Sequence, residues 1–178
     1  PQGCDCPMNR ALRARRFDIV QMLVEHGFDP KTVDMKEVFE SWDPQIMEYF
    51  VERGADVEHG NPFAHALCNR IRTSLKFFKR CKNFSPGIQE QGNIALRHHC
   101  KEGNLKWVSL MLWAGADPYK PGTENPDEVL ENAEDGLSAL GFAALYDHFE
   151  VFKQKAILTR PATSEAVDFV SYLNRGEG

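Results

Sequence analysis

The chain has 178 residues, enough for one domain with a hydrophobic core, and 42% of them are apolar and 26% charged, as in an ordinary globular protein. The net charge of -5 argues against a nucleic-acid coat protein, and no apolar run approaches the roughly 18 residues that a membrane span requires. Five scattered cysteines do not make a disulfide scaffold, and no signal-peptide core stands at the start. We therefore expect a cytoplasmic or otherwise intracellular protein in a reducing compartment.

Helical runs that end in glycine recur along the chain. Residues 19–26, 46–53 and 107–114 place apolar side chains about one helical turn apart, and each run stops at a Gly that is followed two residues later by Asp. Glycine adopts the left-handed conformation that closes a helix, so each run is predicted to be a helix followed by a turn. Shorter helical patterns, each upstream of a second apolar run, lie at residues 6–12, 61–67, 94–100 and 138–144.

A short helix, a longer helix and then Gly-Ala-Asp form a pattern that resembles the ankyrin repeat. The resemblance covers nearly the whole chain and implies an all-α solenoid of helix-turn-helix repeats with short or irregular hairpin fingers. The repeat stack is expected over residues 1–159. Its five units span about residues 4–30, 33–57, 60–84, 89–118 and 132–156.

The repeats are degenerate in length. Successive second helices are expected to end 27, 28, 33 and 44 residues apart, and only one of these spacings equals the usual period of about 33. Trp42 stands where the pattern usually has Gly, and Lys82 and Thr159 replace Gly at two helix ends, so we expect irregular ends there and a degenerate, somewhat bent stack. The residues at the five helix ends are Gly27, Gly54, Lys82, Gly115 and Thr159.

The longest spacing contains an acidic insertion at about residues 119–134. Residues 121–135 carry six acidic side chains and no basic one. Asn125 is expected to cap a short helix over Pro126–Asn132. Two interpretations of the insertion stay open, a solvated long finger and a loop that contacts a partner.

The C-terminal segment, residues 160–178, is expected to cover the end of the stack. Residues 165–173 place Ala166, Phe169, Val170 and Leu173 on one helical stripe. A repeat stack needs its ends covered, so this stripe predicts a C-terminal capping helix followed by a tail.

The ankyrin resemblance assigns partner binding to the first helix of each repeat and to the fingertips. Leu145 and Tyr146 are the most informative pair, because aromatic anchors dominate many interfaces. The C-terminal helix could instead cover both, and Trp113 is expected to pack under the insertion or to mark an outer-face contact. The predicted partner-binding residues are Arg13, Glu40, Cys68, Asn69, Lys101, Glu102, Glu134, Asp135, Leu145 and Tyr146, and further fingertip positions are Glu90, Gln91, Asn93 and Leu137.

A basic cluster lies in the third unit, and several of its members recur at helical three- and four-residue steps. It is read as a solvated helix face, a dock for an acidic protein segment or a phosphate-binding stripe. The acidic insertion of a neighbouring molecule could also neutralise it. Its members are Arg70, Arg72, Lys76, Lys79, Arg80 and Lys82.

No motif in the sequence indicates catalysis or a cofactor. His98, His99 and Cys100 are adjacent and point about 100° apart on a helix, so at most two of them could bind one metal ion. We expect a non-catalytic module that binds another protein on the concave face of its stack, without metal, cofactor, small-molecule substrate or membrane. The alternatives are a nucleic-acid-associated module that uses residues 70–82, although the net acidity argues against it, and a targeting domain excised from a larger enzyme.

Overall fold

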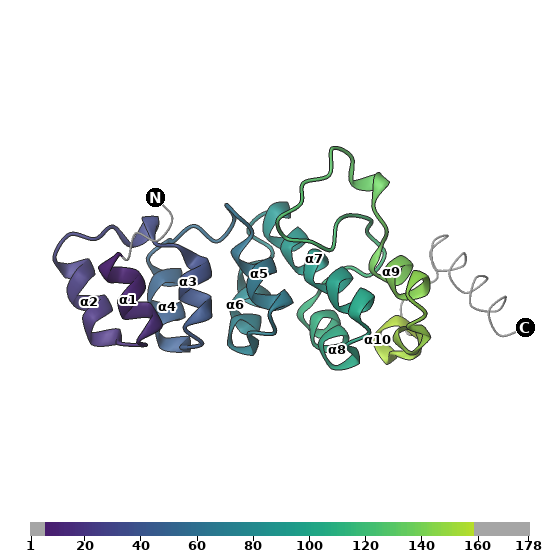
Figure 1. Cartoon of the computed structure of the whole chain (residues 1–178), viewed down its shortest axis with the longest axis horizontal. Coiled ribbons are helices and arrows are strands. Elements are labelled where there is room, and N and C mark those ends of the chain that lie inside the picture. Colours follow the sequence, from purple (N-terminus) through teal and green to yellow (C-terminus); the bar gives the residue numbers. More distant parts are fainter. Residues whose placement is uncertain (1–5, 159–178) are drawn as a thin grey trace, which may run out of the picture. The chain divides into compact units, whose positions relative to one another are not determined.

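The computed structural model describes residues 6–158, and helices are the regular elements over this range (Figure 1). An isolated antiparallel bridge between Gly122 and Leu137 is the one β-type pairing in the described part of the chain. The fold is therefore all-α. The predicted capping helix over residues 165–173, with the rest of 160–178, lies outside the described residues.

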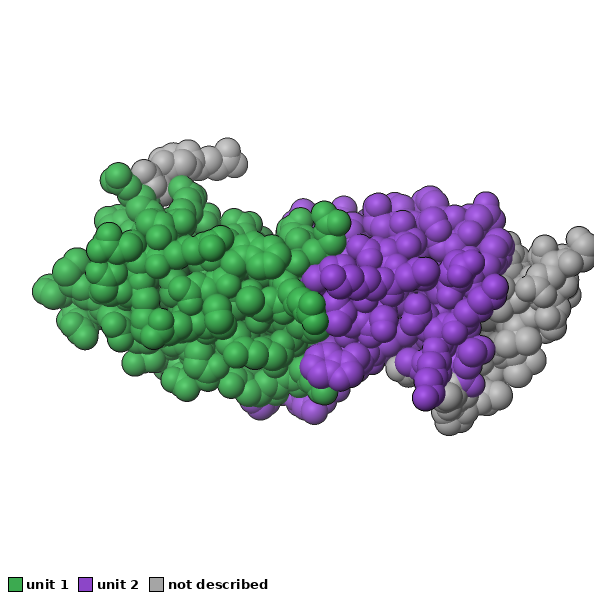
Figure 2. All heavy atoms as spheres, turned by 90° about the horizontal axis from the view of Figure 1, so that it is seen from below, with its two compact units in different colours: residues 1–81 green, residues 82–178 purple. Residues whose placement is uncertain are grey.

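The chain divides into two compact units, residues 1–81 and residues 82–178 (Figure 2). The boundary falls inside the third predicted repeat, directly after its second helix. Each unit is described by itself.

The first unit is built from helix pairs in succession. Helices α1 and α2 contact each other, as do α3 and α4, while α5 contacts the short helix η2 that leads into α6. Contacts also join α1 to α3, α3 to α5 and α2 to α4, so that first helices pack on first helices and second on second. The bounds are α1 Pro7–Arg13, α2 Phe17–Glu25, η1 Pro30–Thr32, α3 Met35–Glu40, α4 Pro44–Glu52, α5 Pro62–Cys68, η2 Arg72–Ser74 and α6 Leu75–Cys81.

The second unit has a longer first helix. Helix α7 packs against α8 and α9, and α9 is followed by η4 and α10, which return toward α8. A long loop joins α8 to α9 (Figure 1). The bounds are α7 Pro86–Glu102, α8 Leu105–Ala114, η3 Ala133–Asp135, α9 Ala139–Leu145, η4 Phe149–Lys153 and α10 Lys155–Leu158.

Local sequence explains where many of these helices begin. Pro44 opens α4 and Pro86 opens α7, at the first turn, where a missing N–H removes no helical hydrogen bond. The side chains of Asp43, Ser85 and Asn104 accept hydrogen bonds from the first free amides of α4, α7 and α8. Such caps stabilise a helix by about 1 kcal/mol each.

The turn after each first helix has the same backbone in both units. A residue in the left-handed conformation closes each turn, two positions after the end of α1, α3, α5 and α9 and one position after the end of α7. These five residues are 27, 28, 33 and 44 positions apart, the same spacings as the predicted ends of the second helices. Four of the five are not glycine, so the sequence gives little sign of the turn there. The residues are Arg15 (φ 54°), Trp42 (φ 59°), Arg70 (φ 62°), Gly103 (φ 73°) and Asp147 (φ 61°).

The predicted glycine helix ends are confirmed at three places. Gly27, Gly54 and Gly115 have φ values of 112°, 77° and 98°. After Gly115, the amide of Ala116 donates to the carbonyl of Met111 (3.0 Å), and equivalent bonds follow Gly27 and Gly54. Each bond satisfies a carbonyl that the end of the helix would leave open.

An aromatic stack runs through the core of the first unit. Phe63 of α5 lies 4.8 Å, centroid to centroid, from Phe39 of α3 and 5.8 Å from Phe78 of α6, and all three are fully buried. These contacts link the second and third helix pairs through one continuous apolar interior, as stacked repeats require.

The expected short helix over Pro126–Asn132 is wrong. The Asn125 side chain accepts from the amide of Asp127 (2.9 Å) and its carbonyl accepts from Glu128 (3.1 Å), which makes a turn that does not continue as a helix. Val129 is 90% exposed, so this segment buries too little apolar surface to offset the cost of starting a helix.

Two further expectations are corrected. Glu90, Gln91 and Asn93 lie within α7 and not at a fingertip, and the last two are buried, because α7 already begins at Pro86. Trp113 is 58% exposed on α8, so the insertion does not bury it.

Candidate functional site

A buried arginine holds the root of the insertion. The Arg97 side chain of α7 is fully buried and forms a bidentate pair with Glu90, at 2.7 and 3.1 Å. Its guanidinium also donates to the carbonyls of Lys120, Pro121 and Thr123, at 3.0 to 3.1 Å. One side chain therefore fixes three backbone positions, and its charge is compensated inside the protein.

The backbone of the insertion approaches this arginine too closely for side chains. A Cβ atom at Gly122 would collide with the Arg97 guanidinium, and one at Gly136 would collide with the backbone of Gly122. The amide of Gly122 donates to the carbonyl of Leu137 (3.1 Å), which closes the base of the loop. The insertion is thus an ordered loop with a fixed root.

Lys101 connects the insertion to the ends of α7 and α9. Its Nζ lies 3.0 Å from Oε1 of Glu124 and 5.4 Å from the centroid of the Tyr146 ring. The hydrogen bond to Glu124 raises the pKa of Lys101. Burial alone would raise the pKa of Glu124, but the hydrogen bond and charge of Lys101 outweigh it, so this pKa lies below its ordinary value.

An exposed apolar pair stands beside this contact. Leu145, the last residue of α9, is 63% exposed, and Tyr146, which follows it, is 45% exposed. Large apolar side chains with this exposure are costly in water unless a partner covers them. Lys101, Glu124, Leu145 and Tyr146 are called the α7/α9 surface below.

Eight of the ten predicted partner-binding residues occupy equivalent places. Each of the eight ends a first helix or lies next to that end, ahead of the left-handed residue that closes the turn. The structure brings Lys101 and Tyr146 together, whereas Glu134 and Asp135 lie exposed in η3. The helix-end positions are Arg13 in α1, Glu40 in α3, Cys68 and Asn69 at α5, Lys101 and Glu102 in α7, and Leu145 and Tyr146 at α9.

In the first unit, the corresponding positions at the ends of α1 and α3 carry charged side chains, Arg13 and Glu40. Arg13 pairs with Glu37 at 3.1 Å. Burial, then the charges of Glu37 and Asp34, raise the pKa of Glu40. The ends of α1, α3 and α5 carry no exposed apolar pair like Leu145 and Tyr146, although Trp42, in the turn after α3, is 42% exposed.

The predicted basic cluster is divided by the structure. Lys76, Lys79 and Arg80 lie exposed on α6, Arg72 opens η2, and Arg70 closes the turn before it. Arg80 forms a bidentate pair with Glu48 of α4, at 3.1 and 3.2 Å, so part of the positive charge is neutralised. Lys82 belongs to the second unit, where it packs over Gly115.

No group of three or more His, Cys, Asp or Glu side chains within residues 6–158 could hold a metal ion. Burial raises the pKa of the Cys100 thiol to about 12 and also raises that of Cys81, which keeps both in the unreactive thiol form at neutral pH. Over the same residues, no helix is both long and apolar enough to cross a bilayer.

No protein-family model matches the chain, and no curated protein matches it. What the protein does must therefore be inferred from its side chains.

Sequence reasoning missed Arg97, the residue that organises this region. It stands in the apolar run of residues 94–100, and a cation in such a run is rarely buried without a partner. That signal, together with Glu90 two helical turns earlier on the same face, could have indicated a buried pair. Its three carbonyl partners lie more than twenty residues away and carry no mark in the sequence.

Proposed function

We propose that this chain is a non-catalytic protein-interaction module with an ankyrin-like repeat architecture, which binds another protein on the α7/α9 surface. The observation that carries the proposal is the exposed pair Leu145 and Tyr146, positioned beside the Lys101–Glu124 contact. An aromatic anchor next to a charged group is typical of the energetic centre of a protein interface.

Preorganisation supports the same function. The insertion is fixed at its root by Arg97, and Lys101 holds Glu124 at the edge of the surface. A surface that is ordered before binding loses less conformational entropy when a partner docks. The equivalent turns after each first helix are what a helix-turn-helix repeat would produce, and they support the ankyrin-like assignment.

The test is affinity capture from a nuclease-treated lysate of the source cells, with retained proteins identified by mass spectrometry. The wild type is compared with the double variant Leu145→Glu/Tyr146→Ala, and Met22→Glu serves as the control, because Met22 is 48% exposed on α2. All three are first shown to be equally helical by circular dichroism.

A protein that the wild type and Met22→Glu retain and the double variant loses is the expected result, with a loss of at least about thirtyfold if the pair is a hot spot of 2 kcal/mol. A partner retained equally by all three would contradict binding at this surface. Recovery of nucleic acid alone, when nuclease is omitted, would favour the alternative function, nucleic-acid binding through the basic cluster of residues 70–82.

A further inference from the structure

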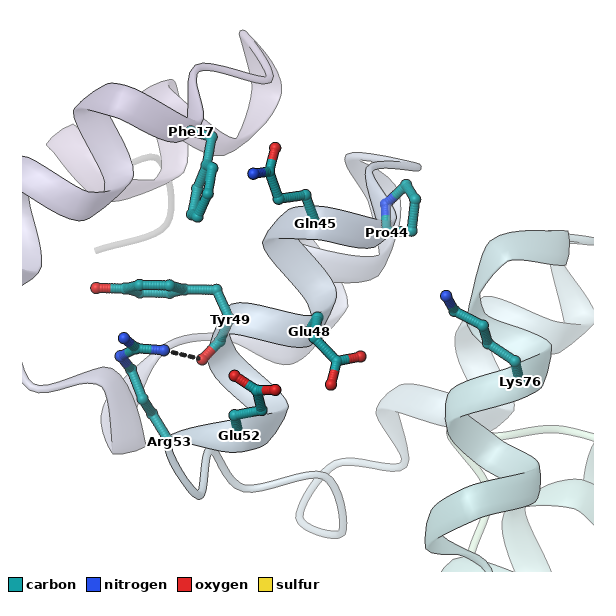
Figure 3. Close-up of a pocket in the computed structure, with 8 residues that line it drawn as sticks. All are labelled: Phe17, Pro44, Gln45, Glu48, Tyr49, Glu52, Arg53 and Lys76. Carbon is teal, nitrogen blue, oxygen red and sulfur yellow. Dashed lines mark hydrogen bonds between the residues drawn. The ribbon is translucent and has the colours of Figure 1, made fainter.

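A groove lies over the outer face of α4, away from the α7/α9 surface in sequence and within the first unit alone. Figure 3 shows side chains of α4 along its floor, Phe17 of α2 on one side and Lys76 of α6 on the other. The hollow has a volume of about 450 Å³. Its lining residues are Phe17, Pro44, Gln45, Glu48, Tyr49, Glu52, Arg53 and Lys76.

One end of the groove is aromatic. The rings of Phe17 and Tyr49 meet edge to face, with centroids 5.3 Å apart. Arg53 also lies over the Tyr49 ring, with its guanidinium carbon 3.6 Å from the ring centroid. The same guanidinium donates to the Tyr49 carbonyl at 3.0 Å. Tyr49 itself is only 8% exposed, so these contacts fix Phe17 as the partly exposed ring against which an apolar side chain could pack.

The lining itself holds two acids, Glu48 and Glu52, and two cations, Arg53 and Lys76, and an excess of positive charge comes from α6 beside it. Arg80 engages both carboxylate oxygens of Glu48, and this hydrogen bonding lowers the pKa of Glu48. Arg53 and Lys76 form no ion pair with a carboxylate among residues 6–158. With Glu48 already compensated, Glu52 is the remaining acid of the lining against these two cations, and Lys79 adds a further positive charge on α6.

The insertion of the same chain has the complementary chemistry. Val129 is its most exposed large apolar residue, at 90%, and Glu128 and Glu131 on either side of it are exposed as well. No basic residue stands between positions 121 and 135. Arg97 and the Gly122–Leu137 bridge hold the root of the loop, and the acidic, apolar tip projects from this fixed base.

We infer that the insertion of a second copy of this chain docks in the groove over α4, with Val129 against Phe17 and its flanking carboxylates facing Lys76. The loop of one copy meets the groove of another, so each copy can both give a loop and receive one. The interface is small, and we expect a dissociation constant of roughly 10 μM to 1 mM.

Sedimentation velocity over a concentration series tests this with four samples. The wild type should show a mass that grows with concentration. Val129→Asp removes the apolar side chain of the loop tip, and Lys76→Glu reverses a charge in the groove. Each should weaken association at least about tenfold. An equimolar mixture of the two variants should form dimers and nothing larger, because one intact loop and one intact groove remain between them.

Two control variants test whether the effects are specific to the groove and the loop. Lys31→Glu makes the same charge change at an exposed lysine outside the groove, and Phe84→Asp makes the same kind of change at an apolar residue that is 75% exposed. Both should self-associate like the wild type. Raising the salt concentration to about 0.5 M should weaken association, since the charges involved are exposed.

A wild type that stays monomeric up to about 1 mM, at the weak end of the expected range, would overturn the inference. So would a mixture of the two variants that stays monomeric, or variants that associate as well as the wild type. None of these substitutions touches Leu145 or Tyr146, so the result does not depend on the proposed partner binding.

Discussion

The two units have the same turn after each first helix, but they differ in charge balance and in how deeply their ion pairs are buried. In residues 1–81, twelve basic side chains balance twelve acidic ones, and the ion pairs, such as Arg80–Glu48, lie at the surface. In residues 82–178, nine basic side chains face fourteen acidic ones, and the central pair, Arg97–Glu90, includes a fully buried guanidinium. The short connections of the first unit need no internal anchor, whereas the long insertion of the second has one.

Burial decides what each pair contributes. An exposed pair is screened by water and salt and contributes about 1 kcal/mol or less. A buried charge that loses its partners destabilises a protein by about 3–5 kcal/mol, because the charge or the groups around it are then desolvated without compensation.

The largest expected effect follows from removing the buried cation. Arg97→Leu should lower the free energy of unfolding by about 3–5 kcal/mol, because Glu90 and the carbonyls of Lys120, Pro121 and Thr123 lose their donor. The matched change in the first unit, Arg80→Leu, should cost about 1 kcal/mol or less. Urea unfolding of both variants measures the difference. Equal effects would show that the two pairs are energetically alike.

Hydrogen exchange gives the same comparison by region. In Arg97→Leu, amides of the insertion should lose protection while those of α1 to α4 keep theirs. Uniform loss of protection over the described residues would contradict a local role for Arg97.

An intermediate effect is expected at the repeated turns. Gly103→Ala places a Cβ against the ring of His148 and forces a left-handed conformation on alanine, so it should destabilise the second unit by about 1–3 kcal/mol. Arg15→Gly makes the opposite change at the equivalent turn of the first unit and should stabilise it by about 0.5 kcal/mol. Thermal unfolding distinguishes the two, and a shift of the same sign in both variants would show that backbone strain does not govern these turns.

The smallest effect is a dependence on pH. Because the pKa of Glu124 lies below its ordinary value of 4.5, its pair with Lys101 stabilises the fold above pH 4.5 and loses this contribution as the pH falls through the lowered pKa. At about pH 7, Glu124→Gln should cost less than about 1 kcal/mol, because the pair is partly exposed. At about pH 3 the cost should shrink. A cost that is constant between these pH values would exclude the pair as its source.

Much of the helical pattern could be predicted from short-range sequence signals. Gly27, Gly54 and Gly115 mark the ends of second helices because glycine fits their left-handed backbone at no steric cost. The turn at Trp42 gives no such signal, since a large side chain occupies a conformation that the surrounding packing imposes. The repeat spacing located this turn although the residue type did not.

The contacts of the second unit were harder to predict. Pro126 and Asn125 are good helix-starting residues, but a helix there would have had no apolar face to bury, and that depends on tertiary structure. The sequence left open whether Leu145 and Tyr146 are exposed or covered by the C-terminal helix, and their proximity to Glu124 depends on how the insertion folds back on α7.

The closed base of the insertion has a consequence for how this protein can vary. The Gly122–Leu137 bridge and Arg97 fix the two ends, so the segment between them can change in sequence or length while the helices keep their packing. Loop-closure entropy grows only slowly with added residues, by about 0.6 kcal/mol for each doubling of the length. Residues 126–135 are therefore a natural place to graft foreign peptides, and a chain with such a graft would keep its helices but lose the loop tip that is proposed to dock over α4.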